Sequence, residues 1–454
     1  MDTTPSPTGA TGTLAHPDHA DGRHAVVLGG SIAGLLAARV LAGRGDRVTI
    51  VDRDEIGPDI RPRRGAPQGH HVHAILAGGQ QALEELFPGL TEQLAARGAP
   101  VGDMLADAHV VFGGNRLCRT RSGLPLVGAS RPLLESTVRE RVLAMDGIHL
   151  APPADVVGLR STTRGIDGVR IVRRLAGSTG EAIDADLVVD TTGRTSRLPS
   201  WLEELGGAAP PVEEVRVDIG YATRRYRVPP DVVGGALAVV IGPTPERPRG
   251  GVLARLEDDV WMATLYGYAG DHPPLDPTGF EAFAASLEPA DLTTALAEST
   301  PIDEAVRHRF PANVRRRYED VRDLPGGLVV MGDALSSFNP VYGQGMAVAA
   351  LQAVALRRRL SGRDRVGSRT IARAMARTIR APWELATGAD LTIPGVVGRR
   401  SRRQRMAARW AARVQTAGTV DPAVARAFVH VTGLVDRPEA LIRPSTVRRV
   451  MSAA

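Results

Sequence analysis

The stretch Val26-Val27-Leu28-Gly29-Gly30-Ser31-Ile32-Ala33-Gly34-Leu35 decides how the first half of the chain is organised. An apolar run ends in a glycine-rich turn, and the small residues after it predict a helix over 33–43. A second apolar run, 48–51, ends on Asp52, which follows Gly29 by 23 residues. This order of strand, glycine turn, helix, strand and acid is typical of a dinucleotide-binding βαβ unit, where the acid follows after about 20 residues.

Each small residue of the turn has a physical role in such a unit. Gly29 permits the tight turn, and Gly34 lets the helix approach the strand closely. The helix N-terminus offers free N–H groups to a pyrophosphate, and Asp52 can accept hydrogen bonds from ribose hydroxyls. The motif expects glycine where the chain has Ser31, whose small hydroxyl side chain can also contact a phosphate. The pattern alone leaves NAD, FAD and an ordinary parallel βαβ unit open.

The composition of the 454 residues is that of a globular protein with room for two or more domains. No apolar run reaches the about 18 residues that a membrane-spanning helix needs. Residues 1–22 are rich in Thr, Pro, Gly and His and lack the apolar centre of a signal peptide, which predicts a disordered tail. Cys118 is the only cysteine, so no intrachain disulfide can form. We therefore expect a cytoplasmic protein without a membrane span.

All 56 basic residues are arginine, because the sequence contains no lysine. Every mechanism that needs a lysine is thereby excluded. The net charge of +6 can attract a carboxylate substrate or an acidic carrier protein, although a solvated arginine-rich surface is the simpler explanation. The densest basic run, Arg399 to Arg405, contains no aromatic residue, so we expect a solvated helix face there and no nucleic-acid partner.

Two segments after the first unit contain candidate cofactor contacts. In loop 63–73, Arg64 and Gln68 can hydrogen-bond a cofactor, and a helix is predicted over 74–86. Three histidines of the loop lie within four residues, but no Cys or carboxylate flanks them at ligand spacing, so no metal site is predicted.

Short alternating segments between residues 108 and 127 predict strands, and a helix is predicted over 133–145. Pro132 suits the first turn of that helix. Arg131 beside it can contact a phosphate or a flavin, or it can pair with Glu135 one turn later.

The middle of the chain is rich in predicted strands. Segments 169–174 and 185–189 are expected as strands around a turn at 177–180. The second strand ends in Asp190-Thr-Thr-Gly193, and ligands of α/β sheets bind at the carboxyl ends of strands. An antiparallel pattern follows in segments 215–221, 226–228, 236–241, 251–256 and 260–266, and helices are predicted over 280–287 and 290–297.

A second strong stretch begins with a predicted strand over 327–332 and continues into a helix of small residues that ends near Leu356. It contains Gly332-Asp333-Ala334, then Pro340, then Gly343-Gln344-Gly345-Met346. This combination resembles the second FAD fingerprint of flavoprotein monooxygenases of the para-hydroxybenzoate hydroxylase type. The turn Asp190-x-x-Gly193 resembles the middle motif of the same superfamily. The resemblance covers about residues 25–356, and it implies FAD, in place of NAD, as the bound cofactor.

A finer resemblance concerns six short segments. They look like segments of the actinobacterial FAD-dependent epoxidases of polyether-ionophore pathways, which epoxidise polyene chains. The segments are Arg64-Gly-Ala-Pro-Gln-Gly-His-His-Val-His73, Phe87-Pro-Gly89, Ser130-Arg-Pro-Leu-Leu-Glu135, Trp201-Leu202, Tyr221-Ala-Thr-Arg224 and Asn339-Pro-Val-Tyr-Gly-Gln-Gly345.

The resemblance also implies roles for individual residues. The βαβ turn, Asp52 and Arg53 would hold the ADP half of FAD, Arg131 would contact the flavin chain, and Asp333 would bind the ribityl hydroxyls. Residues 343–346 would present backbone N–H groups to the O2 and N1 side of the isoalloxazine, where a helix N-terminus stabilises the negative charge of the reduced ring. The full predicted cofactor set is Gly29, Ser31, Ala33, Gly34, Asp52, Arg53, Arg64, Gln68, Arg131, Val156, Asp333, Pro340, Gly343, Gln344, Gly345 and Met346.

The chemistry that the resemblance implies is transfer of one oxygen atom of O2 from a flavin C4a-hydroperoxide to an alkene. NAD(P)H would supply electrons, directly or through a flavin reductase. The expected substrate is an apolar polyene or polyketide of specialised-metabolite biosynthesis, free or bound to a carrier protein. Epoxidation needs no protein nucleophile or base, so no catalytic side chain is predicted.

Several other functions stay open at this point. A hydroxylase of an aromatic or polyketide substrate would benefit from a base, and a flavin-dependent prenyl-chain reductase shares the fold. A flavin halogenase of this superfamily relies on a lysine, which the chain lacks. A non-enzymatic basic interaction protein is the alternative outside catalysis.

The predicted fold is α/β, with a Rossmann-like FAD-binding domain interleaved with an antiparallel-sheet substrate domain and followed by C-terminal helices. We assign residues 23–107, 129–205 and 322–358 to the FAD-binding domain and 108–128 and 206–321 to the β-rich substrate domain. Residues 359–454 form the predicted C-terminal helical region. The antiparallel sheet would floor the substrate cavity, and the helices would cover it.

Overall fold

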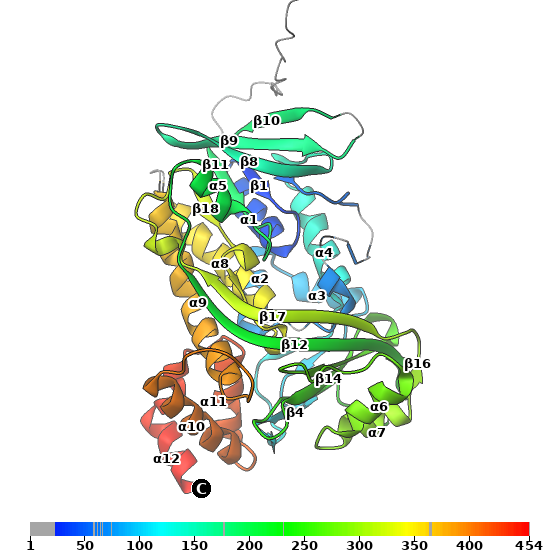
Figure 1. Cartoon of the computed structure of the whole chain (residues 1–454). Helices are drawn as coiled ribbons and strands as arrows, with labels where there is room; N and C mark the ends of the chain where they lie inside the picture. Colours follow the sequence, from blue (N-terminus) through cyan, green and yellow to red (C-terminus); the bar gives the residue numbers. More distant parts are fainter. Residues whose placement is uncertain are drawn as a thin grey trace, which may run out of the picture.

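The computed structural model describes residues 23–57, 60, 62–63, 65, 67–73, 75–175, 178–229, 231–362 and 366–453. The tail predicted at 1–22 and the predicted cofactor residue Arg64 lie outside the described residues. Figure 1 shows a parallel sheet with its helices in the upper half, a long curved antiparallel sheet below it, and the last helices at the lower left. The predicted fold class is confirmed by this combination of sheets and C-terminal helices.

The parallel sheet brings the three predicted motifs to one edge. Its strand order is β18-β11-β1-β2-β7, and β1 is buried along its whole length. Leu28 at the end of β1 is in register with Asp190, and Asp190 is in register with Val330. The turns that follow these strands therefore lie side by side at the carboxyl edge. The five strands are β1 (His24–Leu28), β2 (Arg47–Val51), β7 (Ile148–Leu150), β11 (Leu187–Asp190) and β18 (Leu328–Val330).

Helices cover the parallel sheet and share its core. They are α1 (Ile32–Ala42), α4 (Arg131–Leu143), α8 (Gln344–Leu360) and α9 (Ser368–Asp390). In α9, Ile371, Met375, Ile379 and Trp383 recur at helical spacing and belong to the largest hydrophobic core. The predicted domain boundaries stay a prediction, but α9, which begins beyond residue 359, packs with the part predicted to bind FAD.

The antiparallel sheet is the second large layer. Its strand order is β19-β17-β12-β15-β14-β13-β4-β5, with β16 also paired to β12, and β4 runs parallel to β13. The longest strands, β12 and β17, pair along most of their length and curve beneath the parallel sheet (Figure 1). The strands are β4 (Ala108–Phe112), β5 (Asn115–Arg116), β12 (Val212–Arg227), β13 (Ala238–Ile241), β14 (Arg249–Arg255), β15 (Trp261–Gly267), β16 (Thr300–Pro301), β17 (Val306–Arg316) and β19 (Ser336–Ser337).

Smaller elements complete the described chain. Among the described residues, no helix is both long and apolar enough to cross a bilayer. The remaining strands form two small sheets, one of β8 (Ala154–Thr162), β9 (Gly165–Arg173) and β10 (Gly180–Asp184), the other of β3 (Val101–Asp103) and β6 (Pro125–Val127). The remaining α-helices are α2 (Ala77–Leu86), α3 (Leu90–Ala96), α5 (Leu198–Glu204), α6 (Pro277–Ala285), α7 (Asp291–Ala297), α10 (Arg402–Ala417), α11 (Pro422–Thr432) and α12 (Pro444–Ser452).

Two predictions about the strands are wrong, one about which strands flank a turn and one about where a strand ends. The strands expected at 169–174 and 185–189 do not flank one turn, because β10 lies between them, pairs with β9 and leaves β11 to join the parallel sheet. The segments expected at 215–221 and 226–228 form one continuous strand, β12. Its polar residue Thr223 is buried against His71 and Thr264, so it broke the apolar pattern without ending the strand.

Candidate functional site

A cavity of about 1260 Å³ lies where the parallel sheet, the antiparallel sheet and the C-terminal helices meet. Among the predicted cofactor residues that the structure describes, only Gly34 does not line it. The predicted residues that line the cavity are Gly29, Ser31, Ala33, Asp52, Arg53, Gln68, Arg131, Val156, Asp333, Pro340, Gly343, Gln344, Gly345 and Met346. Residues from separate segments of the chain therefore share one cavity wall.

The β1–α1 turn is shaped by glycine. Gly29 has φ +99°, which L side chains rarely adopt, and a Cβ there would lie 2.8 Å from the carbonyl oxygen of Thr191. A Cβ on Gly34 would overlap the carbonyl oxygen of Gly29. Gly34 thus lets α1 pack directly on the end of β1, although it does not itself face the cavity. The close packing aims the N-terminus of α1 at the cavity.

Ser31 precedes α1 but does not cap it with its side chain. Its hydroxyl donates to Oε2 of Glu135 (2.9 Å) and accepts from Nη2 of Arg131 (3.1 Å). The backbone N–H groups of the first turn of α1 receive no bond from this side chain, so they can bind an anion. Serine in the expected glycine position therefore links α1 to α4.

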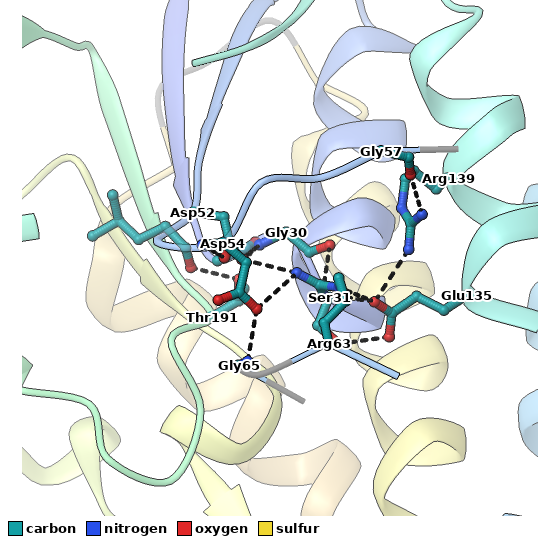
Figure 2. Close-up of polar contacts among 12 residues, drawn as sticks. Gly30, Ser31, Asp52, Asp54, Gly57, Arg63, Gly65, Glu135, Arg139 and Thr191 are labelled. Carbon is teal, nitrogen blue, oxygen red and sulfur yellow. Dashed lines mark hydrogen bonds and ion pairs between the residues drawn. The ribbon is translucent and has the colours of Figure 1, made fainter. Parts of the chain in front are cut away.

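Glu135 is the centre of a buried group of charges, of which the sequence indicated only the pairing with Arg131. Glu135 is 3% exposed, and its carboxylate contacts Arg63 (2.6 Å), Arg139 (3.5 Å) and Arg131 (3.6 Å). Figure 2 shows Arg63 between Glu135 and Asp52, with Arg139 approaching the same carboxylate. Burial by itself raises the pKa of Glu135, but the charges of Arg131 and Arg63 outweigh it and hold the pKa below its usual value.

The spacing of charged residues along one helix could have indicated this cluster from the sequence. Arg131, Glu135 and Arg139 follow each other at four-residue intervals in α4, so all three lie on one helix face. Arg63 comes from the preceding loop, so no regular spacing in the sequence relates it to Glu135. The cluster holds three cations around one anion beside the N-terminus of α1.

Asp52, which directly follows β2, accepts one hydrogen bond from the β1–α1 turn and one from its own turn. Its Oδ2 accepts from the backbone N–H of Gly30 (2.6 Å), and its Oδ1 accepts from that of Asp54 (2.8 Å). Nη1 of Arg63 lies 3.7 Å from Oδ2. Since a carboxylate oxygen can accept two bonds, Asp52 keeps acceptor capacity toward the cavity. Its role as a ribose contact stays a prediction.

The middle motif is held together by Asp190. This residue is fully buried and accepts hydrogen bonds from the hydroxyls of Thr192 (2.6 Å) and Ser196 (2.5 Å) and from the Thr192 N–H (2.9 Å). Asp190 therefore shapes its own turn, and the residues that follow it, Thr191 to Thr195, line the cavity.

The second fingerprint meets the first at Gly332. This glycine has φ +62°, and a Cβ there would lie 2.7 Å from the Cβ of Ala33. The neighbouring Asp333 lines the cavity. Burial within the surrounding protein raises the pKa of Asp333, against the charges of Arg131, Arg194 and Arg316. A carboxyl group beside cations is suited to binding hydroxyl groups.

The N-terminus of α8 also points at the cavity. Gly343 precedes the helix in the left-handed conformation (φ +64°) and has no side chain that could cap it. Gln344 and Met346 are buried in the first turn of the helix. The free N–H groups and the helix dipole favour negative charge at this place.

Unpartnered polar atoms in this wall fit FAD. Nη1 of Arg63 and Nε of Arg131 are buried without a hydrogen-bond acceptor among the described residues, and Oε1 of Gln344 lacks a donor there. Arg63 and Arg131 supply cationic donors near the N-terminus of α1, as a pyrophosphate requires. Gln344 and the first turn of α8 present polar groups to the cavity, and their contact with a flavin ring stays a prediction.

The part of the cavity bordered by the antiparallel sheet contains a small aromatic group. His71 is 7% exposed, its Nδ1 lies 2.7 Å from the Thr223 hydroxyl, and its ring centroid lies 5.2 Å from that of His308. Tyr221 and Tyr266 line the same wall. Burial lowers the pKa of His71 to about 3, so the ring is neutral at pH 7. The described residues contain no group of three or more His, Cys, Asp or Glu side chains that could hold a metal ion.

The C-terminal helices also line the cavity, and the part that they line is here called the arm. In α10, Ala407, Ala408, Ala411 and Ala412 line it at helical spacing, with Gln404 and Gln415 at the ends of the row. Other lining residues of this arm are Phe112 of β4, Val240 of β13, Leu385 of α9 and Phe428 of α11. Most of this lining is apolar, and the predicted cofactor residues are absent from it.

Comparisons with known proteins agree with this arrangement. The chain is 36% identical to the protein Rv3254 of Mycobacterium tuberculosis over 402 residues, which cover 84% of this chain and 82% of that protein. It is 26% identical to a ubiquinone hydroxylase of Rhodospirillum rubrum over 75% of this chain and 73% of that protein. It is 25% identical to a kynurenine 3-monooxygenase of Salinispora tropica over 73% and 71%. No protein-family model matches the chain.

Solved structures share the fold at low sequence identity. A flavoprotein/dehydrogenase from Cytophaga hutchinsonii superposes with a TM-score of 0.66 at 14% identity, covering 95% of this chain and 98% of that one. A p-nitrophenol 4-monooxygenase from Pseudomonas putida superposes with a TM-score of 0.64 at 17% identity, covering 92% and 99%. Both superpositions extend over more than nine-tenths of this chain, so the shared fold includes both large sheets.

Proposed function

The chain belongs to the same protein family as Rv3254 and has the fold of FAD-dependent monooxygenases, and from this premise we propose that it epoxidises alkenes of an elongated apolar molecule. The class of substrate is a polyene or polyketide chain. FAD supplies the oxygen-transferring chemistry when bound, and NAD(P)H is the proposed electron source, directly or through a flavin reductase.

The observation that carries this proposal is the size and lining of the cavity. The two fingerprints and the N-termini of α1 and α8 line one part of it, and the alanine row of α10 lines another. A flat single-ring substrate needs no such arm, whereas a flexible hydrocarbon chain can extend along it. Small side chains at Ala408 and Ala411 leave the space that such a chain requires.

The residues of the chain have binding and shielding roles in this proposal. Arg63, Arg131 and the α1 N-terminus hold the anionic part of the cofactor, and the α8 N-terminus favours negative charge on the flavin ring. The apolar walls keep water from the oxygen-transfer position and hold the alkene near it. No side chain has to take a proton from an alkene.

The first test is an absorption spectrum of the purified full-length protein, followed by anaerobic addition of NADPH. We expect the bands of oxidised flavin and their bleaching by NADPH. Flavin bands that bleach only with an added flavin reductase would assign reduction to a partner. A protein that takes up no FAD when supplied with it would contradict the proposal.

The substrate class is tested by incubating the reduced enzyme with linear polyenes of graded length in the presence of O2. Epoxidation removes olefinic proton signals from the NMR spectrum of the substrate and leaves the rest of the chain unchanged. Equal inactivity on every polyene, together with oxygenation of phenols, would contradict epoxidation.

A hydroxylase of an aromatic substrate is the second candidate, and one observation favours it. The neutral ring of His71 lies beside Tyr221, whose hydroxyl donates to Oδ1 of Asn339, immediately before the predicted flavin loop. A neutral imidazole can accept a hydrogen bond from a phenol. Relatives of the chain include a ubiquinone hydroxylase and a kynurenine 3-monooxygenase. Loss of an aromatic proton signal with 2-naphthol, and no reaction with polyenes, would select this function.

A further inference from the structure

Asp390 is a buried carboxylate at the last residue of α9, outside the predicted cofactor set. It is 0% exposed, and its Oδ1 accepts hydrogen bonds from the Tyr268 hydroxyl (3.0 Å), the Tyr342 hydroxyl (2.8 Å) and Nδ2 of Asn339 (2.8 Å). Its Oδ2 accepts from Nδ2 of Asn313 (2.7 Å). Within the described part of the chain, no cation forms an ion pair with it. All four partners are neutral donors.

The donors come from different elements that border the cavity. Tyr268 follows β15, Asn313 belongs to β17, and Asn339 and Tyr342 belong to the segment before α8. Burial raises the pKa of Asp390, and the four hydrogen bonds oppose this rise. Because every partner donates, a proton on Asp390 would displace one of these bonds.

Asn339 extends the network to Tyr221, in the part of the cavity bordered by the antiparallel sheet. Its backbone N–H donates to Oδ1 of Asn313 (2.6 Å), and its Oδ1 accepts from the Tyr221 hydroxyl (3.0 Å) and the Val341 N–H (3.2 Å). Asn339 and Asn313 are both 0% exposed. The segment that leads into Gly343 is therefore fixed by side chains of α9, β12 and β17.

We propose that Asp390 is a positioning residue that sets the place of the 339–343 loop, and with it the N-terminus of α8, against the flavin ring. The inference rests on the proposed function for the identity of the bound ring. The network itself is a property of the chain. Asp390 acts through its hydrogen-bond partners Asn339 and Tyr342.

The donor pattern explains why a carboxylate is needed at this position. The amide of Asn313 has a fixed orientation, because its Oδ1 accepts from Asn339 while its Nδ2 donates to Asp390. In Asp390→Asn, the new amide keeps one oxygen for the three donors around Oδ1, and its NH2 group then faces the NH2 group of Asn313. Two facing donors leave one of them unpaired in a buried place.

The same geometry defines a rescue. In the double variant D390N/N313D, the carboxylate introduced at position 313 can accept from the Asn339 N–H with one oxygen and from the new amide at position 390 with the other. Every hydrogen bond of the original network then has a partner again, and the negative charge moves from α9 to β17. Rescue therefore separates loop positioning from a requirement for charge at position 390.

The experiment compares full-length wild type, D390N, D390N/N313D and Ser368→Ala. Ser368 is a matched control at the other end of α9, where its hydroxyl accepts from the Leu328 N–H. We expect D390N to bind FAD about tenfold more weakly, to change the band shape of the bound flavin, and to exchange amide hydrogens of residues 336–346 about tenfold faster without FAD. D390N/N313D should restore all three readouts, and Ser368→Ala should change none of them.

Unchanged exchange and unchanged flavin bands in D390N would overturn the inference, as would a double variant no better than D390N. The hydrogen-exchange arm uses protein without FAD. A wild type that takes up no FAD would contradict the proposed function, whereas faster exchange in D390N, restored in the double variant, would still support the positioning of the loop.

Discussion

At the scale of single residues, the cavity wall formed by the predicted cofactor residues, here called the cofactor wall, depends on buried charges that compensate each other. Glu135 holds Arg63, Arg131 and Arg139 together, and Ser31 connects this group to α1. A buried pair contributes little compared with an apolar substitute, but removing one partner leaves the others uncompensated. The cluster is thus sensitive to loss of its one central anion.

Glu135→Gln is expected to lower the free energy of unfolding by about 3–5 kcal/mol, the cost of breaking a buried ion pair from one side. Urea denaturation of the full-length protein measures it. Glu140→Gln is the control on the same helix, because Glu140 pairs with Arg97 on the surface and an exposed pair contributes only about 0–1 kcal/mol. Equal effects of the two variants would contradict the description of the cluster.

The neutral state of His71 predicts a pH dependence of stability. The pKa is about 3 in the folded protein and about 6.5 in an unfolded chain, so below pH 6.5 the unfolded state binds more protons. The stabilising contribution is complete above pH 6.5 and is lost as the pH falls toward 3. Between pH 4 and 6, His71→Gln should reduce the slope of unfolding free energy against pH by about 1.4 kcal/mol per pH unit. His149→Gln, at an exposed position of β7, is the comparison variant in the same urea titrations at each pH.

At the scale of elements, the position of the cofactor wall depends on how closely helices approach strand ends. Gly34→Ala should push α1 away from β1, because the added Cβ would overlap the Gly29 carbonyl oxygen. We expect about 1–3 kcal/mol less stability and at least tenfold weaker FAD binding. Gly362→Ala, where no described residue has an atom within 4 Å of the added Cβ, is the control. Fluorescence titration with FAD measures the affinity, and unchanged binding in Gly34→Ala would contradict the role of close packing.

The sequence predicted those elements whose pattern is local. The helix α1 and the strands β1 and β2 were predicted within a residue or two, since apolar runs and glycine turns mark them. The strand β17 was not predicted, because Arg307, His308 and Arg309 interrupt its apolar pattern and it is defined by pairing with β12. Pairing partners such as Tyr221 and His308 lie far apart in the sequence, so no local pattern contains them.

The residues of the candidate site also divide into those that a local sequence pattern marks and those that only long-range contacts bring in. Glycines and acids of the fingerprints stand at fixed spacings, and the described ones were placed together by the parallel register. Arg63, His308 and Asp390 enter from a loop, a strand and a helix end that only the three-dimensional fold brings together. Their contribution depends on long-range contacts, which a single sequence does not reveal.

At the scale of the whole molecule, the cavity joins three parts that are separate in the sequence. Ala411→Trp is expected to fill the arm beside α10, so activity on long polyenes should fall at least tenfold while activity on the shortest stays within about twofold. Met406→Phe, at a position of α10 that is 72% exposed and outside the cavity lining, should change neither. Product formation over a series of chain lengths measures both variants, and a uniform loss over all lengths would contradict the assignment of the arm.

The two long strands β12 and β17 form one two-stranded ribbon that starts beside the parallel sheet and runs along the antiparallel sheet (Figure 1). Tyr221 and His308 belong to this ribbon and line the cavity, and β19, which ends shortly before the loop at 339, is hydrogen-bonded to it. Because β19 is paired to the same strands, we expect a molecule that displaces Tyr221 or His308 to displace the loop before α8 as well. Substrate binding would then alter the geometry of the predicted flavin site without any domain closing over it.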